Sequence, residues 1–184
     1  MVLAVLVAIS ALGAAVPARA ELRINTLSVF LNDYDVTIHV VLFGAVPDSL
    51  YEGIHSGIPA HVRLRVELWQ YNRFLPDRRT QSRTVERQIT YNPLTKEYKV
   101  LSVRNEHREP YLTKDLREAQ RVISEFRVGN LIPAASLNAK ELYYVRAQSA
   151  VSLSGINSWM TRYNGNAEET DWARSDLLTL TRRQ

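Results

Sequence analysis

The chain has 184 residues, of which 46% are hydrophobic, and a formal net charge of +4 at pH 7. It contains no cysteine, which excludes disulfide bonds, thiolate catalysis, cysteine metal ligands and a lipid-modified N-terminal cysteine. The positive charge favours acidic partners, but basic and acidic residues are mixed along the sequence, as is typical of a solvated surface.

The first twenty residues predict an export signal. Residues 2–16 are almost entirely apolar, and residues 18–20 (Ala-Arg-Ala) have the small-x-small form that a signal peptidase cleaves. The apolar run is shorter than the roughly 20 residues that span a bilayer. We therefore expect residues 1–20 to be a signal peptide cleaved after Ala20, and residues 21–184 to form a single periplasmic domain. The alternatives are an uncleaved membrane anchor and a true start upstream, because no basic residue precedes the apolar run.

A β-hairpin is predicted at the start of the exported domain. Residues 22–31 are rich in β-formers, and residues 34–42 alternate apolar and polar side chains with the period of two that marks a half-buried strand. Asn32-Asp33 between them is a turn signal.

The segment after this hairpin resembles a serine hydrolase's nucleophile turn. That turn has a central serine in Gly-x-Ser-x-Gly and connects a strand to a helix. Here the centre is His55, and the predicted order is helix, turn, strand. Residues 47–49 (Pro-Asp-Ser) begin the helix, Gly57 ends it, and Ile58-Pro59 prevents its continuation. We therefore predict a short helix and no hydrolase elbow.

The middle of the chain predicts a strand and a second hairpin. Residues 60–71 show the clearest alternation, and residues 73–79 form a basic loop. Strands at 83–91 and 97–103 are joined by the turn 92–95. Arg87 interrupts the apolar rhythm of its strand, which favours a position at a sheet edge, where an inward charge discourages aggregation.

The last third predicts one longer helix and two further strands. Apolar residues at helical spacing predict a helix from Thr113, as its cap, to Phe126. A long strand is predicted at 137–153 and a closing strand at 175–180, with an irregular segment at 155–170 between them. Antiparallel hairpins dominate, so we expect a mainly β fold. The predicted architecture is an antiparallel β-sandwich of about seven strands with one short helix and one longer peripheral helix.

Two stretches resemble the motifs of a known family. The first is a Gly-Ile-Pro segment, and the second lies in "ITYNPLTKEYKV". The matching residues are Ile54, Gly57, Ile58 and Pro59 in the first, and Tyr91, Pro93, Leu94, Thr95, Tyr98 and Lys99 in the second. Over residues 22–180 the chain resembles a family of exported bacterial proteins catalogued only as a domain of unknown function. It departs from that family after the central strand, where Gln70, Asn72 and Arg73 replace part of a tryptophan cluster.

The resemblance implies a signal peptide and a β-rich domain, with no catalytic residues. Genes of this family often lie beside a membrane sensor histidine kinase of the nitrogen-regulation type, which implies such a kinase as a partner.

The residues themselves offer no catalytic or metal-binding set. No two of the four histidines have the spacing of ligands on one helix face, and the paired acidic residues lie in turns and polar segments. The candidate partner or ligand surface is the polar face of the central strand with the loop after it, formed by Arg63, Arg65, Trp69, Tyr71 and Arg73. The structural alternative is that the helix 113–126 packs over Trp69 and Tyr71.

The expected function is that of an exported, non-enzymatic binding or assembly module of the cell envelope, without cofactor or metal. Its expected partner is an envelope protein, such as a sensor kinase, or an acidic envelope component such as lipid headgroups, and not nucleic acid. The alternatives are a small-molecule or lipid-binding protein with a cavity between its sheets, and an enzyme with an unrecognised site.

Overall fold

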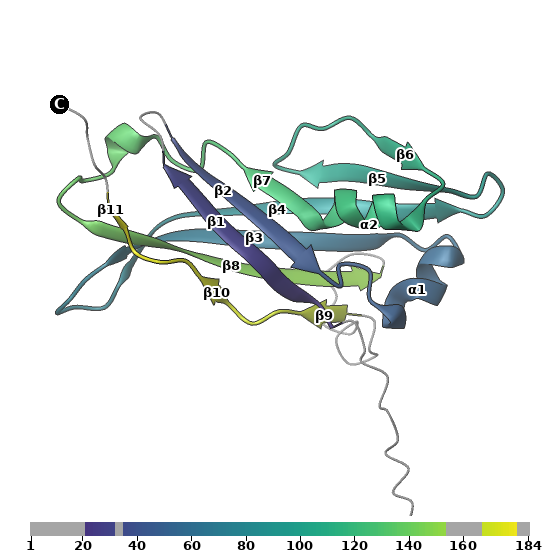
Figure 1. Cartoon of the computed structure of the whole chain (residues 1–184), viewed down its shortest axis with the longest axis horizontal. Coiled ribbons are helices and arrows are strands. Elements are labelled where there is room, and N and C mark those ends of the chain that lie inside the picture. Colours follow the sequence, from purple (N-terminus) through teal and green to yellow (C-terminus); the bar gives the residue numbers. More distant parts are fainter. Residues whose placement is uncertain (1–20, 32–34, 154–166, 180–184) are drawn as a thin grey trace, which may run out of the picture.

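The computed structural model describes residues 21–31, 35–153 and 167–179 (Figure 1). The predicted signal peptide and the predicted turn at residues 32–33 lie outside this part of the chain. In chain order the elements are β1 (Arg23–Leu31), β2 (Val36–Phe43), α1 (Asp48–His55), β3 (Ala60–Tyr71), β4 (Arg78–Asn92), β5 (Glu97–Arg104), β6 (Tyr111–Thr113), α2 (Leu116–Ser124), β7 (Glu125–Val128), the 3₁₀ turn η1 (Ala134–Ser136), β8 (Leu142–Leu153), β9 (Ala167–Glu169), β10 (Ala173–Arg174) and β11 (Leu178–Thr179).

The strands form two antiparallel sheets. The small sheet has the order β1-β2-β7, and the large sheet has the order β10-β8-β3-β4-β5-β6, with β9 and β11 also paired to β8. In Figure 1 the small sheet and α2 cover one face of the large sheet, and α1 lies at one end of the elongated molecule. The predicted mainly β, sandwich-like fold with two α-helices is confirmed. The described residues form eleven strands instead of about seven, because five are short pairings of two to four residues that have no periodic signal.

The core lies between the two layers and follows the predicted alternation. In β3 the even-numbered residues from Ala60 to Leu68 are buried, and in β2 those from Val36 to Leu42 are buried. Successive side chains of a strand point to opposite faces, so each sheet presents one apolar face to the other. The outer face of β3 is left to its odd-numbered residues, among which are Arg63, Arg65 and Trp69 of the predicted surface.

Two inward-facing arginines of β4 connect the layers. Arg83 donates to the carbonyl oxygens of Gly129 and Asn130, at 2.6 and 2.5 Å. Arg87 donates to the carbonyl oxygens of Val122 and Glu125, at 2.6 and 2.7 Å, at the C-terminal end of α2. Unpaired carbonyls at a helix end need such partners.

The prediction that Arg87 lies at a sheet edge was wrong. β4 is flanked by β3 and β5, and Arg87 is 1% exposed. Its guanidinium pairs with the Glu106 carboxylate, at 2.6 Å from Nε to Oε2, and lies 4.2 Å from the centre of the Phe126 ring. The inward charge therefore joins the two layers of the core and does not guard an edge.

Several predicted boundaries also change. The helix predicted from Thr113 to Phe126 is α2, which begins at Leu116 after an Asp115 side-chain cap and ends at Ser124. Phe126 is buried as predicted, but it lies on β7, opposite Val40 of β2. The strand predicted for 137–153 begins at Leu142.

The predicted irregular segment contains β9 at its described end. Of the closing strand predicted at 175–180, the structure has the two-residue β11, and a second short strand, β10, comes just before the predicted range. Neither helix in the described ranges has the length and apolar character needed to cross a membrane.

Candidate functional site

The two motif stretches meet at one end of the molecule. Gly57 follows α1 with φ of +86°, and the amide nitrogens of Gly57 and Ile58 donate back to the carbonyls of Ile54 and Gly53, at 2.9 and 3.0 Å. This double closure is the Schellman motif, which requires a residue that tolerates positive φ. The chain then enters β3 next to the β4–β5 hairpin, where Tyr91 and Tyr98 are cross-strand partners.

His55 joins α1 to that hairpin. Its Nδ1 lies 3.1 Å from the carbonyl oxygen of Tyr51, and its Nε2 lies 2.6 Å from the hydroxyl of Tyr98. A carbonyl only accepts, so Nδ1 carries the proton and Nε2 accepts from Tyr98 in the neutral ring. The imidazole also lies 3.9 Å from the Tyr51 ring and 4.7 Å from the Tyr91 ring. Burial, followed by the nearby tyrosines, raises the pKa of Tyr98. These contacts give the motif residues a packing role, with Leu94 left exposed at the turn.

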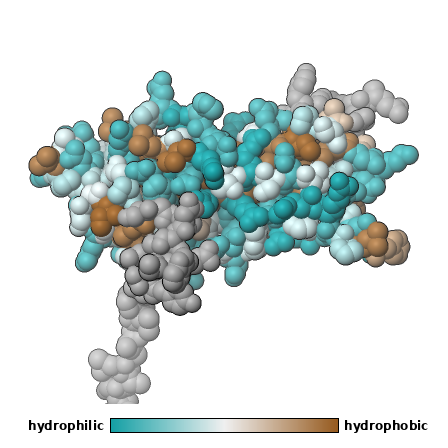
Figure 2. All heavy atoms as spheres, turned by 180° about the vertical axis from the view of Figure 1, so that it is seen from behind, coloured by the Kyte–Doolittle hydropathy of each residue, from teal (hydrophilic) through white to brown (hydrophobic). Residues whose placement is uncertain are grey.

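The predicted surface lies on the outer face of the large sheet, away from the small sheet. Figure 2 shows the molecule from that side, and the central part of this face is mainly hydrophilic. Arg63 and Arg65 lie there side by side with β8 residues Ala150 and Gln148, and Trp69 lies opposite Tyr144. A shallow hollow of about 350 Å³ is lined by Arg63 and Arg65 among others.

Guanidinium groups and aromatic rings alternate across this face. We call this set the arginine–aromatic array: Arg65, Trp69, Tyr144, Arg146, Trp172 and Arg174. The rings of Trp69 and Tyr144 stack with centres 6.4 Å apart and planes 11° apart. Stacking of arginine on an aromatic face is favourable and holds the guanidinium plane in a fixed orientation.

The arginines of the array lie over its aromatic rings. Arg174 lies 3.7 Å from the centre of the Tyr144 ring. Arg146 lies 5.5 Å from the Trp69 ring and 4.5 Å from the Trp172 ring, and Arg65 lies 5.6 Å from Trp172. Three strands far apart in sequence therefore supply one continuous surface.

Two carboxylates hold the array in place. Glu67 is 3% exposed; its Oε2 accepts from the Trp69 indole at 2.9 Å, and its Oε1 contacts Arg65 and Arg79 at 2.8 and 3.1 Å. Asp77 accepts from the Tyr144 hydroxyl at 2.8 Å. Hydrogen bonds from the Asn72 amide and from Tyr144 hold the pKa of Asp77 below its usual value.

Positive charge exceeds negative charge in this cluster. The three arginines of the array and Arg79 outnumber the two carboxylates, and the side chains of Arg146 and Arg174 make no hydrogen bond or ion pair with any residue that the structure describes. Within the described part of the chain, their guanidinium N–H groups therefore remain available to an acidic group that approaches the face.

The structure places three of the predicted surface residues, Arg63, Arg65 and Trp69, on this face. Tyr71 is half-buried at the end of β3, and Arg73 lies in the loop beyond it, over the Phe74 ring at 5.7 Å. The alternative in which the longer helix covers Trp69 and Tyr71 was wrong. α2 packs against β2, β4, β5, β6 and β7, on the opposite side of the large sheet.

Sequence reasoning missed Tyr144, Arg146, Trp172 and Arg174. The signal available was the alternation of β8, where Tyr144 and Arg146 occupy the positions between core residues. The register that places Tyr144 opposite Trp69 joins residues 75 positions apart, and no local pattern reports it.

One side-chain set on the outer face resembles part of a hydrolase triad but lacks its central contact. His61 Nδ1 lies 2.9 Å from Glu86 Oε1, and Ser152 stands opposite His61 in the β3–β8 register. The Ser152 side chain is fully buried, and its Oγ makes no hydrogen bond within the described structure. Activation of a serine requires a hydrogen bond to the base, so this set does not form a catalytic triad.

Two further hollows open on the surface. One, of about 440 Å³, lies between the start of β1 and residues 169–173; the other, of about 310 Å³, lies where Arg87 meets α2. Both are open and lined by more charged or polar residues than apolar ones. Among the described residues, no group of three or more His, Asp or Glu side chains is arranged to hold a metal ion.

A comparison with family models finds a match over residues 19–169 to a domain of unknown function, DUF4390. No curated protein and no solved structure gives a significant match.

Proposed function

The chain belongs to the DUF4390 family, and from the geometry of its outer face we propose that it is an exported, non-enzymatic module that binds an acidic partner in the cell envelope. The observation that carries this proposal is the pair Arg146 and Arg174, whose guanidinium groups lie against aromatic rings and whose side chains make no hydrogen bond or ion pair within the described residues.

The chemistry of the array suits recognition of carboxylate or phosphate groups. A guanidinium offers planar, paired donors that match either anion. Because stacking and the Glu67 and Asp77 contacts already orient the array, little side-chain entropy is lost when a partner binds. Aromatic residues and arginine are also the residue types that contribute most to protein–protein binding energy.

The first partner to test is the exported part of a membrane sensor histidine kinase, because the family resemblance implies one. The predicted signal peptide supports the same compartment, since it delivers the domain to the side of the membrane where such sensors read their signals.

Site-specific cross-linking in living cells tests the proposal. A photo-reactive amino acid is placed at Ser82, which is exposed on the outer face opposite Glu67. We expect a covalent adduct with an envelope protein, and we expect Arg146→Ala combined with Arg174→Ala to abolish it. The same probe at Leu112, 60% exposed on β6, is the positional control and gives no such adduct.

Arg117→Ala is the matched control for the arginine variants, because Arg117 is exposed on α2, away from the outer face. An adduct that persists in the double variant at full yield, or that Arg117→Ala removes equally, would contradict the proposal. Mass spectrometry of the adduct identifies the partner and decides whether it is a sensor kinase.

A further inference from the structure

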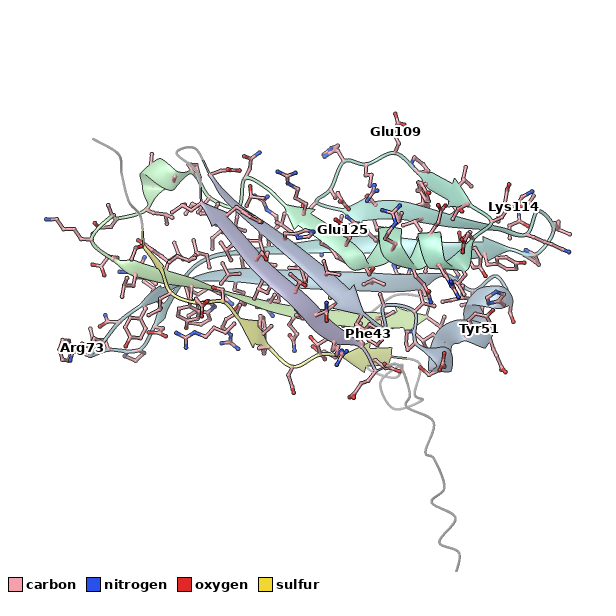
Figure 3. The ribbon with its side chains drawn as sticks, viewed as in Figure 1. Phe43, Tyr51, Arg73, Glu109, Lys114 and Glu125 are labelled. Atoms are coloured by element: carbon pink, nitrogen blue, oxygen red, sulfur yellow. The ribbon has the colours of Figure 1, made fainter. Side chains whose placement is uncertain are left out.

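The β3–β4 hairpin ends in a tip, residues 72–77, that exposes two large apolar side chains. Phe74 is 88% exposed and Leu75 is 68% exposed, although side chains of this size usually lie inside a protein. Figure 3 labels Arg73 in this tip, at the extreme end of the molecule beyond both sheets. In Figure 2, seen from behind, hydrophobic atoms project at the corresponding end.

Hydrogen bonds fix the shape of this tip. The Asn72 side-chain oxygen accepts from the backbone nitrogens of Phe74 and Leu75, at 3.1 and 3.2 Å. Asp77 in turn accepts from the Asn72 nitrogen at 2.9 Å. An asparagine that bonds to the backbone two residues on stabilises a turn. The turn therefore presents Phe74 and Leu75 outward in a set conformation.

Arginines surround the apolar pair. Arg73 and Arg78 are exposed and make no ion pair with a described residue, and Arg73 lies over the Phe74 ring at 5.7 Å. Arg79 is half-exposed, and its guanidinium contacts Glu67 at 3.1 Å. A membrane surface has a layer of lipid phosphates outside the apolar acyl chains. Projecting apolar side chains with basic residues next to them are complementary to these two layers.

We propose that residues 72–79 dock on an anionic phospholipid bilayer. Phe74 and Leu75 enter the headgroup–acyl boundary, and Arg73 and Arg78 contact the lipid phosphates. Charge complementarity favours an anionic lipid surface over a purely apolar protein groove, because arginines both precede and follow the apolar pair in the sequence. Two apolar side chains give weak, reversible docking, because even a single long acyl chain binds membranes only marginally.

The opposite end of the molecule provides a matched control. At the β4–β5 turn, Asn92 organises the backbone in the same way, with its side-chain oxygen accepting from Leu94 and Thr95 at 2.9 and 3.4 Å. Leu94 is 92% exposed. This turn carries one apolar side chain and is followed by Lys96 and Glu97, without an arginine.

Vesicle binding of the full chain, in the form that the expressing cells produce, tests the proposal. Vesicles contain either phosphatidylcholine alone or phosphatidylcholine with phosphatidylglycerol. We expect binding to the anionic vesicles, and a loss of at least about tenfold in the partition constant for Phe74→Ser combined with Leu75→Ser. Leu94→Ser leaves the constant unchanged. Residues 1–20 are common to all variants, so they do not produce a difference between them.

A second measurement reports on the tip directly. Phe74→Trp places a fluorophore at the tip, and we expect brominated lipid in anionic vesicles to quench its emission, whereas the emission of Leu94→Trp is not quenched. Wild-type protein corrects for the three native tryptophans. Equal vesicle binding of the Phe74→Ser/Leu75→Ser variant, or no quenching of Phe74→Trp, would overturn the proposal.

The two proposals fail separately. Arg146→Ala with Arg174→Ala removes the cross-link from Ser82 but leaves the quenching of Phe74→Trp in place. If Phe74→Ser/Leu75→Ser removes the cross-link and leaves vesicle binding intact, the tip is a protein contact and the lipid proposal is wrong.

Discussion

At the scale of single residues, Arg87 joins the two layers through four different groups. It reaches across the core to the Glu106 carboxylate and to two backbone carbonyls, and it lies over the Phe126 ring. Its side chain is 2% exposed and that of Glu106 is 18% exposed. Such a pair is stable only while both charges are present, because an isolated buried charge has no solvent to compensate it.

We therefore expect Arg87→Met to lower the free energy of unfolding by about 3 kcal/mol, since one member of a buried pair is removed and Glu106 is left unpaired. Urea denaturation of the variant and the wild type measures the change. Arg117→Met, on the exposed face of α2, is the control and changes stability by less than about 0.5 kcal/mol. A comparable effect of the two substitutions would show that the Arg87 contacts are not what stabilises the layers.

Arg87 also shows why part of the structure escaped prediction. Its position in an alternating strand was evident, but Glu106 lies 19 residues away and the carbonyls of Val122 and Glu125 lie 35 and 38 residues away. Local periodicity reports only which face a residue occupies. It does not report which distant groups lie on that face, so an inward arginine without a visible partner was assigned to an edge.

At the scale of elements, the clearest predictions were those with strong local signals. The alternation of β3 and the helix α1 with its glycine stop were predicted because side-chain period and backbone conformation are encoded within a few residues. The C-terminal end of α2 was not predicted. The helical spacing of apolar residues continues to Phe126, but from Glu125 onward the chain is extended and pairs with β2. Tertiary pairing there outweighs local helical preference.

The stop after α1 depends on Gly57. At φ of +86° an L side chain is strained, so we expect Gly57→Ala to cost about 1–2 kcal/mol of stability. The added Cβ would meet only the Tyr91 carbonyl oxygen at 3.7 Å, an ordinary contact, so the cost is conformational. Thermal and urea unfolding measure it.

Gly129→Ala is the matched control for Gly57→Ala. A Cβ at Gly129 would lie 3.8 Å from Thr37 Oγ1, and the backbone there is not in the positive-φ region. The expected cost at this position is small. If both substitutions destabilised the protein equally, the positive φ would not be the reason for glycine at position 57.

At the scale of the whole molecule, carboxylates that are paired with basic side chains make the free energy of unfolding depend on pH. Burial by itself raises the pKa of Glu106 and of Glu86, but hydrogen bonds and charge from Arg87, and from His61 and Arg63, outweigh it and hold each pKa below the ordinary 4.5. A carboxyl group whose pKa is lower in the folded state stabilises the fold above its ordinary pKa. That contribution is lost as the pH falls through the lowered value.

We expect the free energy of unfolding to vary little with these groups above about pH 6 and to fall steadily below about pH 4.5. Urea denaturation across this range tests the prediction. Glu106→Gln is less stable at neutral pH but shows a shallower acid decline, because one of the two groups no longer takes up a proton. An identical decline in the variant would exclude Glu106 as a source of the acid sensitivity.

The tip and the arginine–aromatic array share the strand β3: the tip connects the end of β3 to β4, and the array runs across β3, β8 and β10 on the outer face of the same sheet. A domain held by its tip would therefore carry the array upright beside the lipid surface, within reach of any protein anchored in the same leaflet. Encounters would then occur in two dimensions instead of three, and a contact too weak to be detected in dilute solution would be occupied through high effective concentration.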